Sequence, residues 1–183
     1  MTGADYGFVA GVGYGRSISV GTRTLLVSAG AVAPWARMDA RDFDVHVGAT
    51  VGLAGQRRWR LIGGLGGSLR ATENAHARMR NLAADGVLMG GYWTPGWFVT
   101  AEVGYDNAIA THIEHSDYYR ARIHPDARDG WYVDTGANIR VGLAGGLSFG
   151  HHDLVLRAGQ ARDREGHAQL LPAYVTLGLN LRF

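Results

Sequence analysis

Large apolar residues alternate with small or polar residues along most of the chain. Between Tyr6 and Val20, the even positions are mostly large and apolar, whereas the odd positions are almost all glycine or serine. A β-strand points successive side chains to opposite faces, so this period of two predicts a strand with one apolar and one small face. The same pattern recurs in segments that begin at Phe43, Trp59, Trp97 and Trp131.

Nine runs of the chain show this strand character. They are residues 6–20, 24–36, 43–55, 58–71, 77–93, 97–113, 131–149, 152–162 and 171–183. Strands of soluble proteins usually have five or six residues, whereas a strand that crosses a bilayer at a tilt needs about nine to eleven. Because the runs are this long, we predict an all-β fold: an antiparallel up-and-down transmembrane β-barrel made of one domain, residues 1–183.

The number of strands follows from how barrels close. Single-chain bacterial barrels have an even number of strands. We therefore expect eight strands, with one of the runs 6–20, 24–36 or 77–93 not forming a strand. The alternative is that the chain is a piece of a larger barrel.

The connections between the runs differ in length. Turn-forming residues occupy the short connections at 21–23, 55–57, 94–96 and 150–152. Longer polar stretches occupy 37–42, 72–77, 114–130 and 162–169. Short turns at one end and longer loops at the other are typical of transmembrane barrels, as are tryptophans near the ends of the strands.

The last run carries the most specific signal. Its alternate residues Val175, Leu177, Leu179, Leu181 and Phe183 share one face, and Phe183 is the final residue. This segment, which includes Tyr174, resembles the C-terminal signal by which bacterial outer-membrane proteins are recognised for assembly. The resemblance implies a bacterial outer-membrane location, contact with outer-membrane lipid and lipopolysaccharide, and recognition by the barrel assembly machinery.

Composition excludes several other classes. No apolar stretch is long enough for a transmembrane helix, and the absence of cysteine excludes disulfides and thiolate metal sites. All 18 Lys and Arg residues are arginine, scattered among 16 acidic residues rather than clustered, so we expect no nucleic-acid partner. Residues 1–5 lack the basic and apolar regions of a signal peptide, which we infer has been removed.

The small and polar faces of the runs contain charges of both signs. We predict that these side chains form a lumenal charge network, made of Asp44, His46, Arg60, Arg70, Glu102, Asp106, Asp134, Arg140, Arg157 and Arg182. Buried charges need partners, and a narrow barrel favours a plug of ion pairs. A charged conduction path is the alternative.

The longest loop begins with a dense polar cluster. We predict that it is a contact surface whose candidate residues are His112, His115, Ser116, Asp117, Tyr118 and Tyr119. A divalent metal held by His112, His115 and a carboxylate is an alternative, although the spacing is not specific. Small outer-membrane lipid A deacylases use a His and a Ser two residues apart, and this spacing is not matched here. We predict no catalytic residue, metal or cofactor.

For function we expect a non-enzymatic outer-membrane scaffold or anchor with exposed loops, bound to an envelope partner of unknown identity. One alternative is a small channel or the C-terminal barrel of an exopolysaccharide exporter. A second alternative is a lipid A-modifying enzyme that uses His112, His115 and Ser116.

Overall fold

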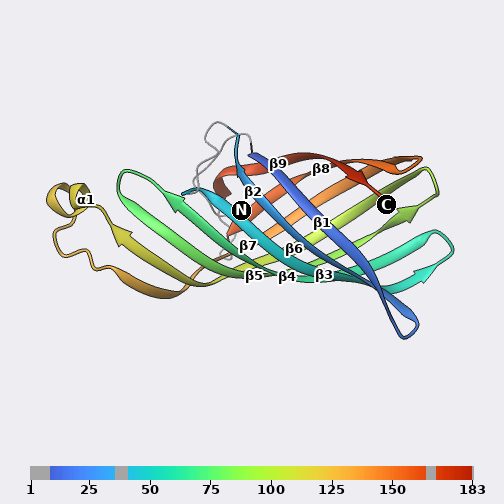
Figure 1. Ribbon diagram of the computed structural model, residues 1–183, viewed down its shortest axis with the longest axis horizontal. Coiled ribbons are helices and arrows are strands. Elements are labelled where there is room, and N and C mark those ends of the chain that lie inside the picture. Colours follow the sequence, from blue (N-terminus) through green and yellow to red (C-terminus); the bar gives the residue numbers. More distant parts are fainter. Residues whose placement is uncertain (1–8, 36–40, 164–167, 183) are drawn as a thin grey trace.

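The computed structural model describes residues 9–35, 41–163 and 168–182. Nine strands and one short helix follow each other along the chain (Figure 1). They are β1 (Val9–Val20), β2 (Arg23–Pro34), β3 (Phe43–Gln56), β4 (Trp59–Glu73), β5 (Ala77–Trp93), β6 (Trp97–His115), α1 (Asp117–Arg122), β7 (Gly130–Phe149), β8 (His152–Asp163) and β9 (Ala168–Leu181). Within the described residues, no helix has the length and hydropathy to cross a membrane.

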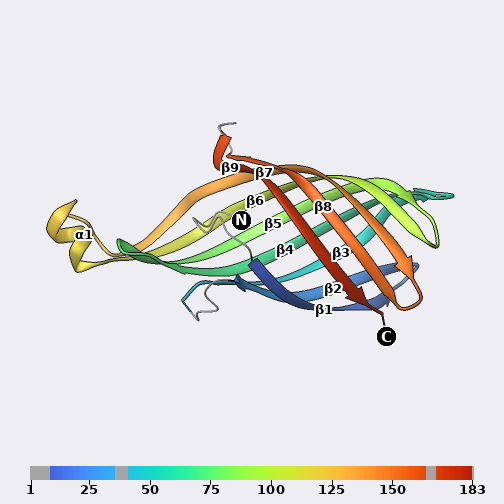
Figure 2. The ribbon, with the colours of Figure 1, turned by 90° about the horizontal axis from the view of Figure 1, so that it is seen from above.

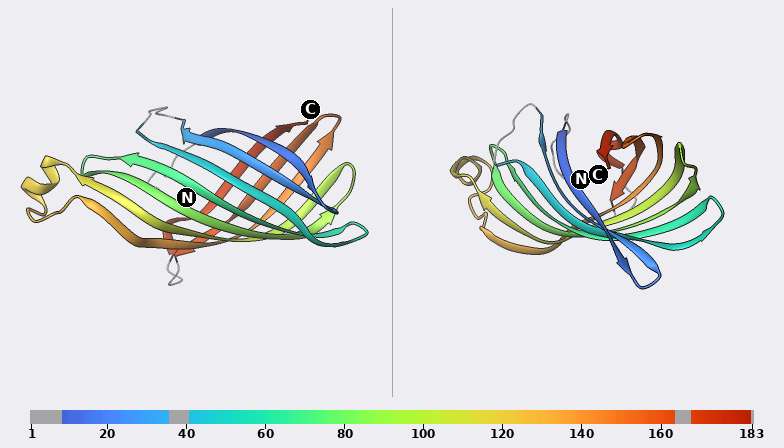
Figure 3. Two further views of the ribbon diagram at one scale, coloured as in Figure 1. Left: turned by 60° about the horizontal axis from the view of Figure 1, so that its bottom comes forward. Right: turned by 45° about the vertical axis from the view of Figure 1, so that its right-hand side comes forward.

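Each strand pairs antiparallel with the next one along the chain, so the sheet has the order β1 to β9. The sheet curls into a half-barrel, and β1 and β9 flank its open side (Figures 2 and 3). Among the described strands, β1 pairs only with β2, and β9 pairs only with β8. The up-and-down all-β prediction is therefore confirmed.

The expected number of eight strands is wrong, because all nine runs form strands. The even number applies to a barrel in which the first and last strands close against each other in antiparallel pairing. In this open sheet β1 and β9 run in the same direction and do not pair, so the number of strands is not restricted to even values.

The two faces of the sheet differ as the alternation predicts. On the convex face, Val12 and Leu65 are 78% and 76% exposed. On the concave face, Thr100 and Ala144 are only 3% and 4% exposed. The concave face is crowded because the strands curve toward each other, so small residues occupy most of it.

The two ends of the sheet differ in their connections. Two-residue turns at 21–22, 57–58 and 150–151 lie at one end together with the turn at 94–96, and Gly21 and Gly150 adopt left-handed φ angles of 58° and 59°. The opposite end carries the connections 74–76 and 116–129. The predicted loop at 72–77 shrinks to three residues, since Asn74 Oδ1 accepts hydrogen bonds from the backbone N–H groups of His76 and Ala77 at 2.8 and 2.9 Å.

A β-bulge in β6 changes which side chains face inward beyond it. The pairing of β5 with β6 shifts between Leu82 and Ala83, so that Ile109 is an extra residue on β6. In the pairing of β6 with β7, two residues of β7, Asp134 and Thr135, lie opposite Ile109. As a result Thr111 faces the concave side, and His112 packs against the exposed Trp131 with ring centroids 5.0 Å apart. Strict alternation from Asp106 would place His112 on the concave face, and the extra residue Ile109 places it on the convex face instead.

Candidate functional site

An arginine on β4 joins two carboxylates that lie on different strands of the concave face. The Arg70 guanidinium donates to Asp44 of β3 at 2.9 Å, and to both carboxylate oxygens of Asp106 of β6 at 2.5 and 3.3 Å. The Asp106 side chain is only 3% exposed. Arg70 therefore supplies the charge that compensates a deeply buried carboxylate, and the bidentate contact fixes its orientation.

A second polar group connects β6 with the C-terminal strand. The Tyr174 hydroxyl of β9 donates to Glu102 Oε1 at 3.0 Å, and Arg157 of β8 lies 3.9 Å from Glu102 Oε2. Two glycines make room for the tyrosine, because a Cβ on Gly142 or Gly159 would lie 2.5 or 2.6 Å from its hydroxyl. The glycines of β7 and β8 thus allow Tyr174 to reach across the concave face.

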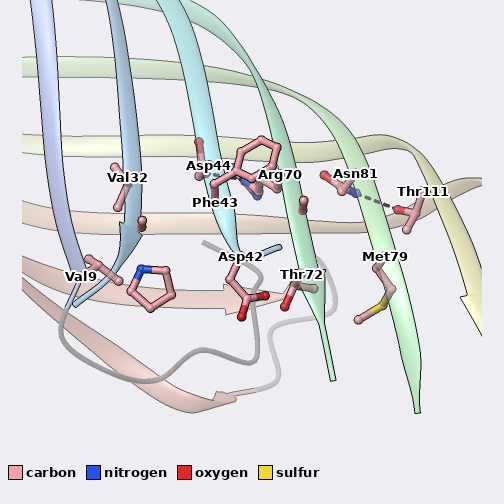
Figure 4. A pocket seen from close by; sticks show the side chains of 13 residues that line it. Val9, Val32, Asp42, Phe43, Asp44, Arg70, Thr72, Met79, Asn81 and Thr111 are labelled. Carbon is pink, nitrogen blue, oxygen red and sulfur yellow. Dashed lines mark hydrogen bonds and ion pairs between the residues drawn. The ribbon is translucent and has the colours of Figure 1, made fainter. Parts of the chain in front are cut away.

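Two cavities meet at the Arg70 bridge, which we define as Arg70 with Asp44 and Asp106. The larger cavity has a volume of about 330 Å³, and the bridge lines it together with Glu102, Arg140 and residues of β2, β3 and β8. The smaller cavity, of about 160 Å³, lies at the long-loop end of the sheet, and it is mostly apolar (Figure 4). Asp44 and Arg70 line both cavities, so the bridge stands between them.

The structure brings together most, but not all, of the residues predicted for the lumenal network. The larger cavity is lined by Asp44, His46, Arg70, Glu102, Asp106, Arg140 and Arg157. Arg60 instead lies over the Trp93 ring at 5.9 Å, and Arg182 lies 3.2 Å from Asp153 near the short turns. Asp134 is exposed, with a left-handed φ of 51°.

Sequence reasoning missed one acidic residue of the larger cavity. Asp85 of β5 lines it beside Arg70 and Glu102. The inward positions of β5 also include Ala83 and Val87, so the strand does not show the clear contrast between large apolar and small polar faces seen elsewhere. Asp85 pairs directly with Asp106 on β6, which places both side chains on the concave face. This pairing could not be used at the sequence level, because it requires the register of the two strands to be known.

The long loop after β6 folds into a compact structure, here called the loop knob and defined as residues 114–130 (Figure 1). Ser116 caps helix α1, because its side chain accepts a hydrogen bond from the backbone N–H of Tyr119 at 3.2 Å. The same hydroxyl donates to the backbone carbonyl of Ala75 at 2.8 Å. The knob is thereby fastened to the β4–β5 turn, and a helix replaces part of the expected irregular loop.

Asp129 closes the loop knob from its other end. Its carboxylate accepts the backbone N–H of His115 at 2.7 Å and also pairs with Arg120. The hydrogen bond from the His115 backbone and the contact with Arg120 lower the pKa of Asp129 to about 2. Aromatic contacts complete the knob, with the His115 ring stacked on Tyr119 at 5.1 Å.

The predicted contact residues of the loop are engaged in local contacts. The Ser116 hydroxyl is engaged by backbone groups, and the ring of His115 faces Asp129 at 3.2 Å. His112 lies near Glu114, at 3.5 Å. Across the described residues, no group of three or more potential ligands is arranged to hold a metal ion.

The predicted assembly segment falls mostly within β9. Leu179 and Leu181 are exposed on the convex face, whereas Tyr174 points to the concave face. Phe183 lies outside the described residues. Comparisons of the chain with protein-family models, with curated proteins and with solved structures gave no match.

The Arg70 bridge yields a stability prediction. Substitution Arg70→Met should lower the free energy of unfolding by about 3–5 kcal/mol, because it leaves the Asp106 carboxylate buried without its partner. Urea unfolding of the protein measures the change. Adding Asp106→Asn should restore part of the loss, because it removes the unpaired charge.

The matched control lies on the same strand. Arg60→Met removes an exposed arginine whose guanidinium lies over the Trp93 ring, and should lower the free energy of unfolding by no more than about 1 kcal/mol. If the two substitutions lower the free energy of unfolding equally, the effect of Arg70→Met does not arise from the burial of Asp106.

The low pKa of Asp129 predicts how the loop knob responds to acid. Because this pKa is lower in the folded state than the ordinary value of 3.8, the contact stabilises the knob fully above that value. The stabilisation should be lost as the pH falls toward about 2. Amide exchange at His115, followed by NMR, should accelerate in this range, and Asp129→Asn should abolish the acid-dependent step. A midpoint near pH 5 would contradict the assigned contacts.

Proposed function

We propose that this protein is a non-enzymatic β-barrel protein of a bacterial outer membrane, which anchors and presents the loop knob. One observation carries the proposal: large apolar side chains are exposed along the convex face, while the ionic groups gather on the concave face. Water-soluble proteins rarely expose so continuous an apolar surface. The hydrocarbon core of a bilayer would cover this apolar convex face.

The distribution of aromatic residues supports a membrane orientation. Near the short turns, the rings of Trp59, Tyr92 and Trp97 form a row with neighbouring centroids 5.5 and 5.6 Å apart. Near the opposite end, Trp35 and Trp131 are 67% and 66% exposed. Two aromatic belts at the ends of an apolar band are expected at the two interfaces of a membrane.

In this orientation, lipid and lipopolysaccharide contact the convex face, and the C-terminal strand serves recognition by the assembly machinery. The loop knob projects from the long-loop end, beyond the neighbouring strands (Figures 1 and 2). Its exposed side chains include Tyr118 and Ile123. Because Ser116 and Asp129 already order the knob, a partner loses little conformational entropy there on binding.

The membrane proposal is tested by a charge on the convex face. Leu65 lies near the middle of β4 and is 76% exposed. Leu65→Arg should lower the free energy of unfolding in phosphatidylcholine vesicles by about 2–4 kcal/mol, because the arginine would face the hydrocarbon core. Urea titration of the refolded protein, followed by tryptophan fluorescence, provides the measurement.

Ile123→Arg is the control for this experiment. Ile123 is similarly apolar and exposed, but it follows α1 in the loop knob, outside the strands. It should therefore leave the stability in vesicles unchanged. If Leu65→Arg also has no effect, the convex face does not contact lipid and the proposal fails.

A second candidate function is transport, either as a small channel or as the barrel part of an exopolysaccharide exporter. The observation that favours it is the position of the Arg70 bridge between two cavities on the concave face. In addition, Arg140 Nε and Glu102 Oε2 are buried without a hydrogen-bond partner among the described residues, so the larger cavity retains unused polar groups. A bridge in this position could act as a plug within a conduction path.

Planar-bilayer conductance separates an anchor from a channel. For an anchor plugged by the bridge, we expect no steady conductance from the parent protein. We expect steady steps from the double variant Arg70→Ser/Asp106→Ser, which removes the central ion pair and leaves only the partly exposed Asp44 of the bridge. Steady conductance of the parent protein would place transport ahead of anchoring. A silent double variant that is folded would show that the bridge does not block a path.

A further inference from the structure

We infer that a β-strand from another polypeptide binds in the gap between β1 and β9, pairing antiparallel with both edges. The inference rests on the proposed membrane location. The relevant surface is the open side of the half-barrel, where the two edge strands flank the same opening (Figures 2 and 3).

The edge strands are exposed on both faces, unlike the central strands. On β1, Gly13 and Ser17 of the concave-side set are exposed together with Tyr14 of the convex set. On β9, Thr176 and Asn180 are exposed as well. By contrast, Thr100 and Asp106 on the concave side of β6 are 3% and 2% exposed. The opening therefore leaves both side chains and backbone of β1 and β9 uncovered.

A bilayer makes these open edges costly. In a strand, alternate backbone N–H and C=O groups point to the side away from the paired neighbour, and β1 is 12 residues long. Each unsatisfied group in the hydrocarbon core costs several kcal/mol, so open sheet edges do not occur there. The edges must be paired for the sheet to remain in a membrane.

The directions of the strands limit what can pair with them. β1 and β9 are both odd-numbered in an up-and-down sheet, so they run in the same direction. Direct closure would need a parallel pair in a sheet whose other pairs are all antiparallel. A second copy inserted in the same orientation would meet the same parallel seams. Only an odd number of added strands keeps every pair antiparallel, and one strand is the smallest solution.

The neighbouring side chains define the chemistry of the added strand. On the convex side it would lie beside Tyr14 and Ile18 of β1 and Leu177 of β9, so its lipid-facing residues should be large and apolar. On the concave side it would lie beside Gly13 and Gly178, which leave room for larger polar side chains. The occupant is thus an amphipathic strand about as long as β1, with no charge on its lipid-facing side.

Amide hydrogen exchange of the full chain in phosphatidylcholine vesicles tests the inference. In the protein alone, edge amides of β1 and β9 should exchange at least about tenfold faster than those of β5. The probe is a synthetic peptide with the sequence of Arg23–Pro34, since β2 already pairs antiparallel with β1. Arg23 is replaced by alanine in the peptide, because it lies opposite Val20 on the convex side and the added strand should carry no charge there. The peptide should slow exchange on β1 and β9 together by about tenfold, whereas a peptide of the same composition without the alternation should not.

Several results would overturn the inference while leaving the membrane proposal intact. Edge amides that are protected in the inserted protein alone would mean that the barrel closes on itself. Protection that appears only at a high ratio of protein to lipid would mean that a second copy fills the gap. Slowing on one edge only, or on neither, would exclude a strand between them.

A disulfide test gives an independent measurement, because the chain contains no cysteine. The double variant Val12→Cys/Leu177→Cys places thiols on the convex side of the two edges. It should remain reduced under mild oxidation if the gap is as wide as a strand, since a disulfide requires Cα atoms within about 7 Å. Rapid internal cross-linking would overturn the inference. Failure of the parent protein to insert into vesicles even with the peptide present would instead overturn the proposed function.

Discussion

Continuous pairing between neighbouring strands makes each side chain of the sheet face either the concave or the convex side. Because all nine strands join one sheet, a residue's face depends on its position in the strand and on the register with both neighbours. The resulting separation places Leu65 and Val12 on one surface and Thr100 and Asp106 on the other. The proposed membrane contact and the ionic network are both consequences of this single constraint.

The concave face combines small residues with a few charged ones, and each kind depends on the other. Glycines such as Gly142 and Gly159 let neighbouring strands curve closely and let Tyr174 reach Glu102. The space they leave is then crossed by long charged side chains, of which Arg70 is the central one. Each carboxylate on this face needs such a partner, because removal from water without one is costly. The network therefore stabilises the curl of the sheet and also divides the space it encloses.

The long-loop end of the sheet is ordered by local hydrogen bonds, whereas the two edge strands each pair on one side only among the described strands. At the long-loop end, Ser116 and Asp129 use local hydrogen bonds to build an ordered knob that is suited to contact with a partner. At the edges, β1 and β9 have no partner of their own among the described strands beyond β2 and β8. Open sheet edges do not occur in the hydrocarbon core of a membrane, so the proposed anchor function and the inferred additional strand are connected.

The sequence by itself determined the all-β class, the nine strand runs and the division into an apolar and a polar face, because these follow from local alternation. It also indicated seven of the charged residues that line the larger cavity. It did not indicate that Arg70 joins Asp44 to Asp106, that Asp85 lines the same cavity, or that the bulge at Ile109 turns His112 outward. These features, and the open side between β1 and β9, were decided only by the tertiary structure, because register, tilt and curl result from contacts between strands that are distant in the chain.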